Sequence, residues 1–292
     1  MRLFSSDPCC GGIGVQVSDE RCIDVRAAVD ALRCPPVASS MLELLASPRG
    51  LEEVRRLVDD IGDRDGPWVL PTDAVALSAP IPRPGKILGV ALNYRDFCER
   101  GRVPLPTRPK VFAKFATTVV GPGRPVLVPD GLQVTYEGEL AVVIGRTVRN
   151  VRAKDALKAV AGYTVFNDLT ASTYVREDVQ LLRGKNLDTF GPMGPYLVTA
   201  DEVPNPDDLA ISTVVNGVER QRSRTSQMVF GIAELVEFFA TFCTLEPGDV
   251  IATGTPAGTA AQHTPPGFVQ AGDTVSVSVQ AVGTLINPIA AA

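Results

Sequence analysis

Strand-like and helical patterns follow one another in the first part of the chain. Apolar and polar residues alternate over residues 13–17 and 22–25, as in half-buried strands, whereas residues 26–32 and 51–61 have the spacing of amphipathic helices. Prolines at positions 80, 82 and 84 then disfavour both continued helix and central strand. We therefore expect a small α/β domain at residues 1–75 and a second domain at residues 76–292.

The second domain has mostly strand-like patterns. Buried strands are predicted at residues 86–92, 111–115 and 140–144, and short amphipathic helices only at residues 153–160 and 233–239. Asn216-Gly217 lies between apolar segments and predicts a hairpin, because both central positions of that turn need positive φ. The fold class that follows is mixed α+β, dominated by strands, with a barrel or folded sheet in the larger domain.

Composition excludes several classes of protein. A net charge of −5 without a long basic run disfavours nucleic acid as a partner, and the single histidine excludes metal centres that need two. The sequence contains no apolar run long enough for a membrane span and no signal peptide, so we expect a soluble cytoplasmic protein. The six cysteines form no C-x-x-C pair; we expect mostly small buried residues, with Cys9-Cys10 as the exception.

Two carboxylates precede the apolar strand at residues 140–144. Glu137 and Glu139 are spaced i, i+2, so their side chains project to the same face, where two anions repel unless a cation compensates them. Asp168, at the end of a second apolar segment, is a candidate third ligand, or else a helix N-cap. Oxygen ligands favour a hard cation such as Mg²⁺ or Mn²⁺. The alternative is that Glu137 and Glu139 bind no cation and simply lie in water at the start of the strand, where paired acids are common.

Two further segments are candidates for contacts with a substrate. Lys185 follows a glycine in what we expect to be a short loop, where it could contact an anion or donate a proton, although a surface lysine is the commoner case. Thr253, Gly254 and Thr255 form a loop after a strand, whose amides and hydroxyls could hold a carboxylate or phosphate. The loop lacks the lysine of a P-loop, and the glycines at positions 11, 12 and 14 lack the spacing of a dinucleotide fingerprint.

These segments together resemble the fumarylacetoacetate hydrolase family over most of the chain. The resemblance lies in KILGVALNYR (86–95), YEGELAVVIGR (136–146), GYTVFNDLTA (162–171), GKNLDTFGPMGP (184–195), VNGVE (215–219) and LEPGDVIATGTPAG (245–258). It implies a β-roll catalytic domain, a homodimer and one Mg²⁺ or Mn²⁺ held by Glu137, Glu139 and Asp168. It further implies that Lys185 is catalytic and that substrate contacts come from Tyr94, Lys114, Thr253, Gly254 and Thr255.

Two positions depart from the family pattern. Many hydrolytic members have a histidine where this chain has Phe97, and a glutamate two residues later, here Glu99; together they activate water. Glu99 could still act as the base, and His263 could replace the histidine, although we expect His263 to lie in an exposed loop. A substrate-binding arginine of the family is replaced by Ser172, and Arg176 or Arg183 could take over its role.

The resemblance therefore leaves three functions open. The family default is a metal-dependent hydrolase that cleaves a C–C bond beside an enolisable 2-oxo or β-diketo group of a small acid. Loss of the histidine favours a decarboxylase or a keto–enol tautomerase, which need only the metal and a proton donor such as Lys185. The third hypothesis is a member that binds a ligand without turnover; the retained acidic pair argues against it, because paired carboxylates repel without a cation.

Overall fold

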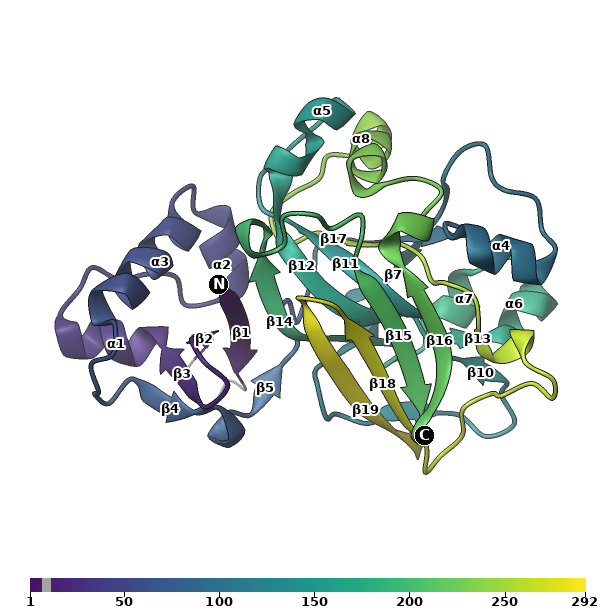
Figure 1. The fold of residues 1–292 in the computed structure, drawn as a ribbon, viewed down its shortest axis with the longest axis horizontal. Coiled ribbons are helices and arrows are strands. Elements are labelled where there is room, and N and C mark those ends of the chain that lie inside the picture. The colour runs from purple at the N-terminus through teal and green to yellow at the C-terminus, as the bar shows by residue number, and fades with distance from the viewer. Residues whose placement is uncertain (7–11) are drawn as a thin grey trace.

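A computed structural model describes residues 1–6 and 12–292 of the 292-residue chain. Cys9 and Cys10 lie outside the described residues. Among the described cysteines, Cys22 and Cys98 are buried, and all four in this part of the chain are free. Figure 1 shows the N-terminal elements beside a larger body of strands.

The N-terminal unit combines a small antiparallel sheet with three helices. Its strands and helices are β1 (Arg2–Ser6), β2 (Ile13–Gln16), β3 (Arg21–Asp24), α1 (Val25–Leu32), α2 (Met41–Ala46), α3 (Gly50–Ile61), β4 (Val69–Pro71) and β5 (Leu77–Ser78). Asp24 caps α1 by accepting a hydrogen bond from the amide of Ala27 at 3.0 Å. The predicted strands and helices of this part are confirmed, and β1, α2, β4 and β5 are additional.

The larger part of the chain is built mainly from strands. In chain order its helices and strands are β6 (Ile87–Ala91), α4 (Arg95–Gly101), β7 (Lys110–Lys114), β8 (Val119–Val120), β9 (Val126–Val128), β10 (Val134–Thr135), β11 (Gly138–Ile144), α5 (Ala153–Ala156), β12 (Val160–Asn167), β13 (Thr170–Ala171), α6 (Ser172–Asp178), α7 (Leu182–Lys185), β14 (Gly191–Thr199), β15 (Ala210–Val215), β16 (Val218–Arg224), α8 (Ile232–Phe242), β17 (Val250–Ala252), β18 (Thr274–Val279) and β19 (Gly283–Ala291). The mixed, strand-dominated α+β class is confirmed.

One sheet runs through both parts of the molecule. Its order is β4-β3-β2-β1-β14-β12-β11-β17-β6-β7, so that β1 of the N-terminal unit pairs directly with β14. A second sheet, β16-β15-β18-β19-β9, lies in front of it in Figure 1. The turn between β15 and β16 has positive φ at Asn216 and Gly217, as the sequence predicts.

The central strand β11 separates two apolar cores. Leu140, Val142 and Ile144 pack with the second sheet and α8, whereas Ala141 and Val143 pack with the N-terminal unit. The alternation follows from the two-residue period of a strand. The strand that follows the acidic pair is therefore held from both faces.

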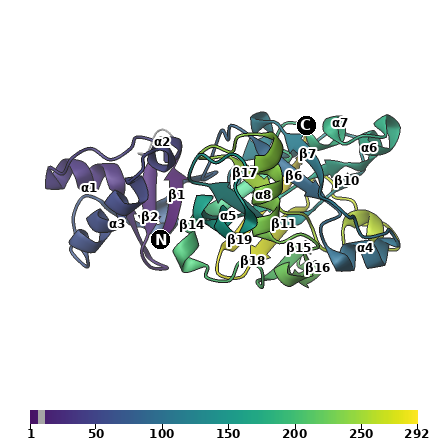
Figure 2. The ribbon, with the colours of Figure 1, turned by 90° about the horizontal axis from the view of Figure 1, so that it is seen from above.

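The helices of the larger part are more numerous than the sequence predicts. Only residues 153–160 and 233–239 were expected to be helical, and the first of these is α5 followed by a 3₁₀ turn that ends before β12. α4, α6 and α7 are additional, and they are too short, at four to seven residues, to show a clear apolar period. Figures 1 and 2 show that these three helices gather at the end of the molecule opposite the N-terminal unit.

Candidate metal centre and substrate pocket

The antiparallel pairing of β11 with β12 brings the three predicted metal ligands together. Gly138 faces Asn167 in the register, so that the residues just before β11 lie beside those just after β12. The amide of Asp168 donates to the carbonyl of Glu137 at 2.9 Å, and the Asn167 side chain accepts from the amide of Glu137 at 3.0 Å. One carboxylate oxygen from each of Glu137, Glu139 and Asp168 lies within 4.8 Å of the others.

Two lysines lie against these carboxylates. Lys185 Nζ is 2.9 Å from Glu137 Oε2 and also bonds Asp168 Oδ2, and Lys114 Nζ is 2.9 Å from Asp168 Oδ1. Glu139 instead accepts a hydrogen bond from the amide of Gly254 at 2.8 Å. We call these five residues, Glu137, Glu139, Asp168, Lys114 and Lys185, the triad site.

Burial and neighbouring charges shift the pKa values in the triad site in opposite directions. Burial raises the pKa of Glu139 well above its usual range, and repulsion by Asp168 adds to the effect. Burial also raises the pKa of Glu137, although Lys185 opposes the rise. For Asp168 burial alone would raise the pKa, but Lys114 and Lys185 outweigh it and the pKa is lowered.

The pKa values of the two lysines shift in opposite directions. Burial lowers the pKa of Lys114 more than Asp168 raises it. For Lys185, Asp168 and Glu137 outweigh burial, and the pKa is raised. Lys185 is therefore held in its protonated form.

The donor set of the triad site suits a hard divalent cation. Three carboxylates face only two ammonium groups in a buried place, and the proximity of Asp168 makes the charged form of Glu139 costly. A dication would compensate that repulsion, and ligands that are all oxygen favour Mg²⁺ or Mn²⁺ over zinc. Asp168 is not a helix N-cap, because α6 begins only at Ser172.

A cavity of about 390 Å³ opens beside the triad site. Its walls include Glu137, Lys185 and Thr255 together with Phe97 and Phe112. Lys185 Nζ lies 4.8 Å from the centre of the Phe112 ring. Lys185 ends helix α7 and is nearly fully buried, so the expected short loop is wrong at this position. The cavity has room for a small organic acid and offers it a buried ammonium group.

Several predicted substrate contacts have structural partners instead. Thr253 donates to the carbonyl of Leu140 at 2.8 Å and does not line the cavity. Gly254 has φ of 104°, and a side chain there would lie 2.8 Å from Asn93 Cβ, so this position requires glycine. Thr255 lines the cavity and donates to the carbonyl of Gly138 at 3.0 Å. The loop thus fixes the strand of the acidic pair, and only Thr255 of the three reaches the cavity wall.

Tyr94 and Glu99 do not line the cavity either. Tyr94 is fully buried in the larger core, and its hydroxyl has no hydrogen-bond partner among the described residues. Burial and the nearby carboxylates of Glu139 and Asp96 raise its pKa well above the usual range. Glu99 is exposed on α4, whereas Phe97 of the same helix faces the cavity. Their predicted roles remain predictions.

His263 is not in an exposed loop position. Its ring is half-buried, and Nε2 lies 2.8 Å from the carbonyl of Gly258, to which it donates. The expectation of an exposed histidine is therefore wrong, because the loop after Thr255 folds back on itself. His263 does not line the cavity.

Two polar residues of this region have no signal in the sequence analysis. Thr170 donates to Glu137 Oε1 at 2.8 Å. Gln221, buried on β16, accepts from the amide of Gly138 at 3.0 Å and donates to Thr255 at 2.8 Å. Thr170 lies two residues after Asp168, and this proximity alone could have suggested that it contacts the acidic residues. Nothing in the sequence links Gln221 to the acidic pair, because the link is made by the packing of two sheets.

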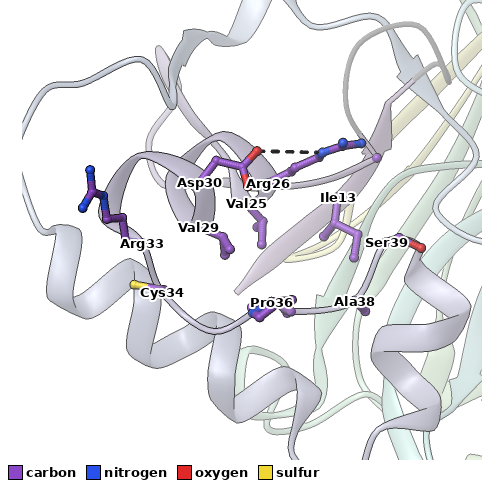
Figure 3. A pocket seen from close by; sticks show the side chains of 12 residues that line it. Ile13, Val25, Arg26, Val29, Asp30, Arg33, Cys34, Pro36, Ala38 and Ser39 are labelled. Carbon is purple, nitrogen blue, oxygen red and sulfur yellow. Dashed lines mark ion pairs between the residues drawn. The ribbon is translucent and has the colours of Figure 1, made fainter.

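A larger cavity of about 680 Å³ lies in the N-terminal unit, between α1, β2 and residues 36–39 (Figure 3). Its walls are largely apolar, with Ile13, Val25 and Val29 facing the space, and an ion pair of 4.0 Å joins Arg26 and Asp30 at its edge. Among the described residues, the only group of three side chains suited to a metal is that of the three carboxylates in the triad site. The reactive groups therefore accompany the smaller cavity.

Comparison with known proteins agrees with this fold and site. The family model described as fumarylacetoacetate (FAA) hydrolase C-terminal matches residues 86–290. The chain belongs to the fumarylacetoacetate hydrolase family, whose members include hydrolases, isomerases and tautomerases.

Two similar relatives are named as oxaloacetate tautomerases. The mitochondrial FAHD2A of Bos taurus is 44% identical over 224 residues, which are 76% of this chain and 71% of that protein. YisK of Bacillus subtilis (strain 168) is 38% identical over 287 residues, 95% of each chain. Among solved structures, maleylpyruvate hydrolase from Sphingobium sp. SYK-6, in complex with manganese(II) and pyruvate, is 29% identical with a TM-score of 0.80 and covers 99% of both chains.

In the described part of this chain, no helix is long and apolar enough to cross a membrane.

Proposed function

We propose that this protein is a divalent-metal-dependent keto–enol tautomerase of oxaloacetate. The observation that carries the proposal is the cavity itself, whose wall contains the protonated Lys185 and Glu137 of the carboxylate triad, and has Phe97 where a base could activate water. The similarity to two oxaloacetate tautomerases supports the same substrate. The family's hydrolytic activity is the main competitor, since a similar solved structure is a maleylpyruvate hydrolase.

Glu137, Glu139 and Asp168 would hold the Mg²⁺ or Mn²⁺. When bound, the cation supplies positive charge that stabilises an enolate oxygen and lowers the cost of moving a proton at the neighbouring carbon. Thr170 and Gly254 orient Glu137 and Glu139 through their hydrogen bonds, at 2.8 Å in both cases. The homodimer that the family resemblance implies stays a prediction.

Lys185 is the proton donor in this proposal. Its raised pKa means that Nζ carries a proton when the enol binds. Nζ gives this proton to C3 as the ketone forms, while the enol hydroxyl releases its proton to water and the neutral Nζ then regains a proton from water. In the reverse direction Nζ first loses a proton to water and then takes the proton from C3, while the carbonyl oxygen of the substrate takes up a proton from water. Phe97 and Phe112 contribute apolar surface to the cavity wall and carry no group that could activate water, which disfavours hydrolysis.

The test is a comparison of three reactions with the purified protein. Loss of the enol form of oxaloacetate, formation of pyruvate and CO₂ from oxaloacetate, and cleavage of an acylpyruvate are followed with Mg²⁺, with Mn²⁺ and with EDTA. We expect metal-dependent tautomerisation to exceed the other two rates by about 100-fold or more. Faster acylpyruvate cleavage or faster decarboxylation would overturn the proposal in favour of that reaction.

Phe97→His tests why tautomerisation is preferred. If the missing base explains the preference, acylpyruvate cleavage rises by about tenfold or more in this variant. Phe230→His serves as the control, because Phe230 is an aromatic residue that does not line the cavity. An unchanged rate in Phe97→His would contradict this account of the preference.

A further inference from the structure

We infer that Arg176 binds the substrate carboxylate that points away from the triad site, so that the cavity selects 2-oxo dicarboxylates over 2-oxo monocarboxylates. The inference rests on the proposed function and names the group that recognises the second acid. Arg176 lines the same cavity as Glu137 and Lys185. Those two side chains neutralise each other at 2.9 Å, whereas no ion pair is recorded for Arg176 among residues 1–6 and 12–292.

The partner of Arg176 holds its guanidinium group without neutralising it. Arg176 donates to Gln133 Oε1 at 2.6 Å, and Gln133 lies just before β10. The carbonyl of Gln133 in turn accepts from the amide of Ser172, at the start of the same helix, at 2.8 Å. The charge is therefore held in position by a neutral amide and stays available for an anion.

Arg183 is excluded from this role by its own contacts. It forms ion pairs with Glu177 at 2.8 Å and with Asp178 at 2.6 Å, and its guanidinium carbon lies 3.8 Å from the centre of the Tyr174 ring. It does not line the cavity. The charge of Arg183, which lies on α7, is already engaged by two acids and one of its faces by an aromatic ring, so Arg176 on α6 is the one of these two arginines that remains for a ligand.

The position of Arg176 on α6 also fits the role. Ser172 and Arg176 are four residues apart, so they lie on the same face of the helix, and both line the cavity. Serine is short, which leaves the space in front of this face open to the longer arginine. Oxaloacetate has a carboxylate at each end, and a planar guanidinium group forms paired hydrogen bonds with such a group.

The first experiment separates KM from kcat. Arg176→Gln is expected to raise KM for oxaloacetate by about 10- to 100-fold, the effect of losing one charge-assisted contact, while kcat changes by less than about threefold. For phenylpyruvate, a 2-oxo acid without a second carboxylate, both constants should stay within about twofold of the wild-type values. Arg183→Gln is the matched control, with expected changes below about twofold for both substrates. A large effect of Arg183→Gln, or an equal effect of Arg176→Gln on both substrates, would overturn the inference.

Gln133→Glu tests the same point with Arg176 in place. A carboxylate at this position would pair with the guanidinium group and remove its availability, so KM for oxaloacetate should rise as it does in Arg176→Gln. Arg176→Lys keeps a positive charge but cannot form the paired hydrogen bonds of a guanidinium group. Its KM for oxaloacetate should therefore lie between that of the wild type and that of Arg176→Gln. An unchanged KM in Gln133→Glu would contradict the claim that the free charge is what the substrate uses.

Binding of non-reacting acids keeps the test independent of turnover. Malate and lactate differ in the second carboxylate, and calorimetric titration of the Mg²⁺-loaded protein gives their affinities. We expect the wild type to bind malate at least about tenfold more tightly than lactate, and Arg176→Gln to bind them equally. If the wild type prefers malate but does not tautomerise oxaloacetate, the proposed function fails and the role of Arg176 stands. If it tautomerises oxaloacetate but binds both acids equally, only the inference fails.

Discussion

Within residues 1–6 and 12–292, lysines form ion pairs with buried carboxylates at two places, and the two places differ in how the charges are balanced. At the edge of the larger core, Lys86 lies 2.9 Å from Asp249 and 2.8 Å from Glu246; we call these three residues the Lys86 bridge. Its one buried acid, Asp249, also accepts from the amide of Glu246 at 2.8 Å, while the Glu246 side chain is 61% exposed. In the triad site, two lysines pair with Glu137 and Asp168, and the third carboxylate, Glu139, has no lysine partner.

The two clusters differ in where their excess negative charge lies, which is in water for the Lys86 bridge and in a buried place for the triad site. In the Lys86 bridge, water screens the excess charge on Glu246, and none of the three residues lines the cavity beside the triad site. In the triad site, the excess negative charge lies beside a cavity where a ligand can enter. Buried charge that its neighbours do not compensate is costly for folding and is typical of functional sites.

The largest difference should be in catalysis. Lys185→Met is expected to lower the rate of oxaloacetate tautomerisation by about 10²- to 10⁴-fold, because it removes the proton donor. Lys86→Met should change the rate by less than about threefold, since Lys86 contacts no residue of the cavity wall. Steady-state rates of the two variants at saturating Mg²⁺ check this expectation. Comparable losses in both would remove the distinction between the two clusters.

The next difference is the response to metal. At a Mg²⁺ concentration 100 times its Kd, the free energy of unfolding should rise by about 2.7 kcal/mol relative to EDTA. Glu137→Gln should abolish most of this increase, whereas Asp249→Asn should leave it intact, because Asp249 belongs to the Lys86 bridge. Urea denaturation with Mg²⁺ and with EDTA measures both. An increase that survives in Glu137→Gln would show that the metal binds elsewhere.

Without metal, neutralising one acid in each cluster should have opposite effects. Glu139→Gln is expected to stabilise the EDTA-treated protein by about 1 kcal/mol. The substitution removes a carboxyl group whose charged form is disfavoured by burial, as the raised pKa of Glu139 indicates. Burial raises the pKa of Asp249 too, but its carboxylate has Lys86 at 2.9 Å and the Glu246 amide at 2.8 Å as direct partners. Asp249→Asn should therefore destabilise the protein by about 1–2 kcal/mol, because both partners lose a charged acceptor. Denaturation midpoints in EDTA show whether each variant is more or less stable than the wild type. If both variants change stability in the same direction, the proposed excess of negative charge in the triad site is contradicted.

The smallest difference concerns alkaline pH. For Lys86 burial acts to lower the pKa, but Glu246 and Asp249 outweigh it and the pKa is raised. The resulting stabilisation is fully present below the unfolded pKa of about 10.4 and is lost as the pH rises through the folded pKa. Because the side chain is 29% exposed, we expect less than about 1 kcal/mol. Stability measured from pH 9 upward should fall more steeply in the wild type than in Lys86→Met; parallel curves would show that Lys86 contributes nothing.

The sequence predicts the carboxylates of the candidate metal site better than it predicts their surroundings. Glu137, Glu139 and Asp168 could be predicted because a strand has a period of two residues and because the family motifs surround them. The helices that complete the cavity could not, since α4, α6 and α7 are stabilised by packing rather than by an amphipathic pattern. The contacts of Gln221 depend on which strands of two sheets meet, which no local pattern specifies.

The pairing of β1 with β14 has a practical consequence for shortening this chain. Leu3 of β1 faces Leu197 of β14, and the contact covers one side of a strand whose other side holds β12. A chain that begins at residue 76 would leave the amides and carbonyls of this part of β14 unpaired along an apolar edge. Such an edge is a template for strands of other molecules. The separated catalytic part should therefore self-associate, even though every residue of the triad site is still present.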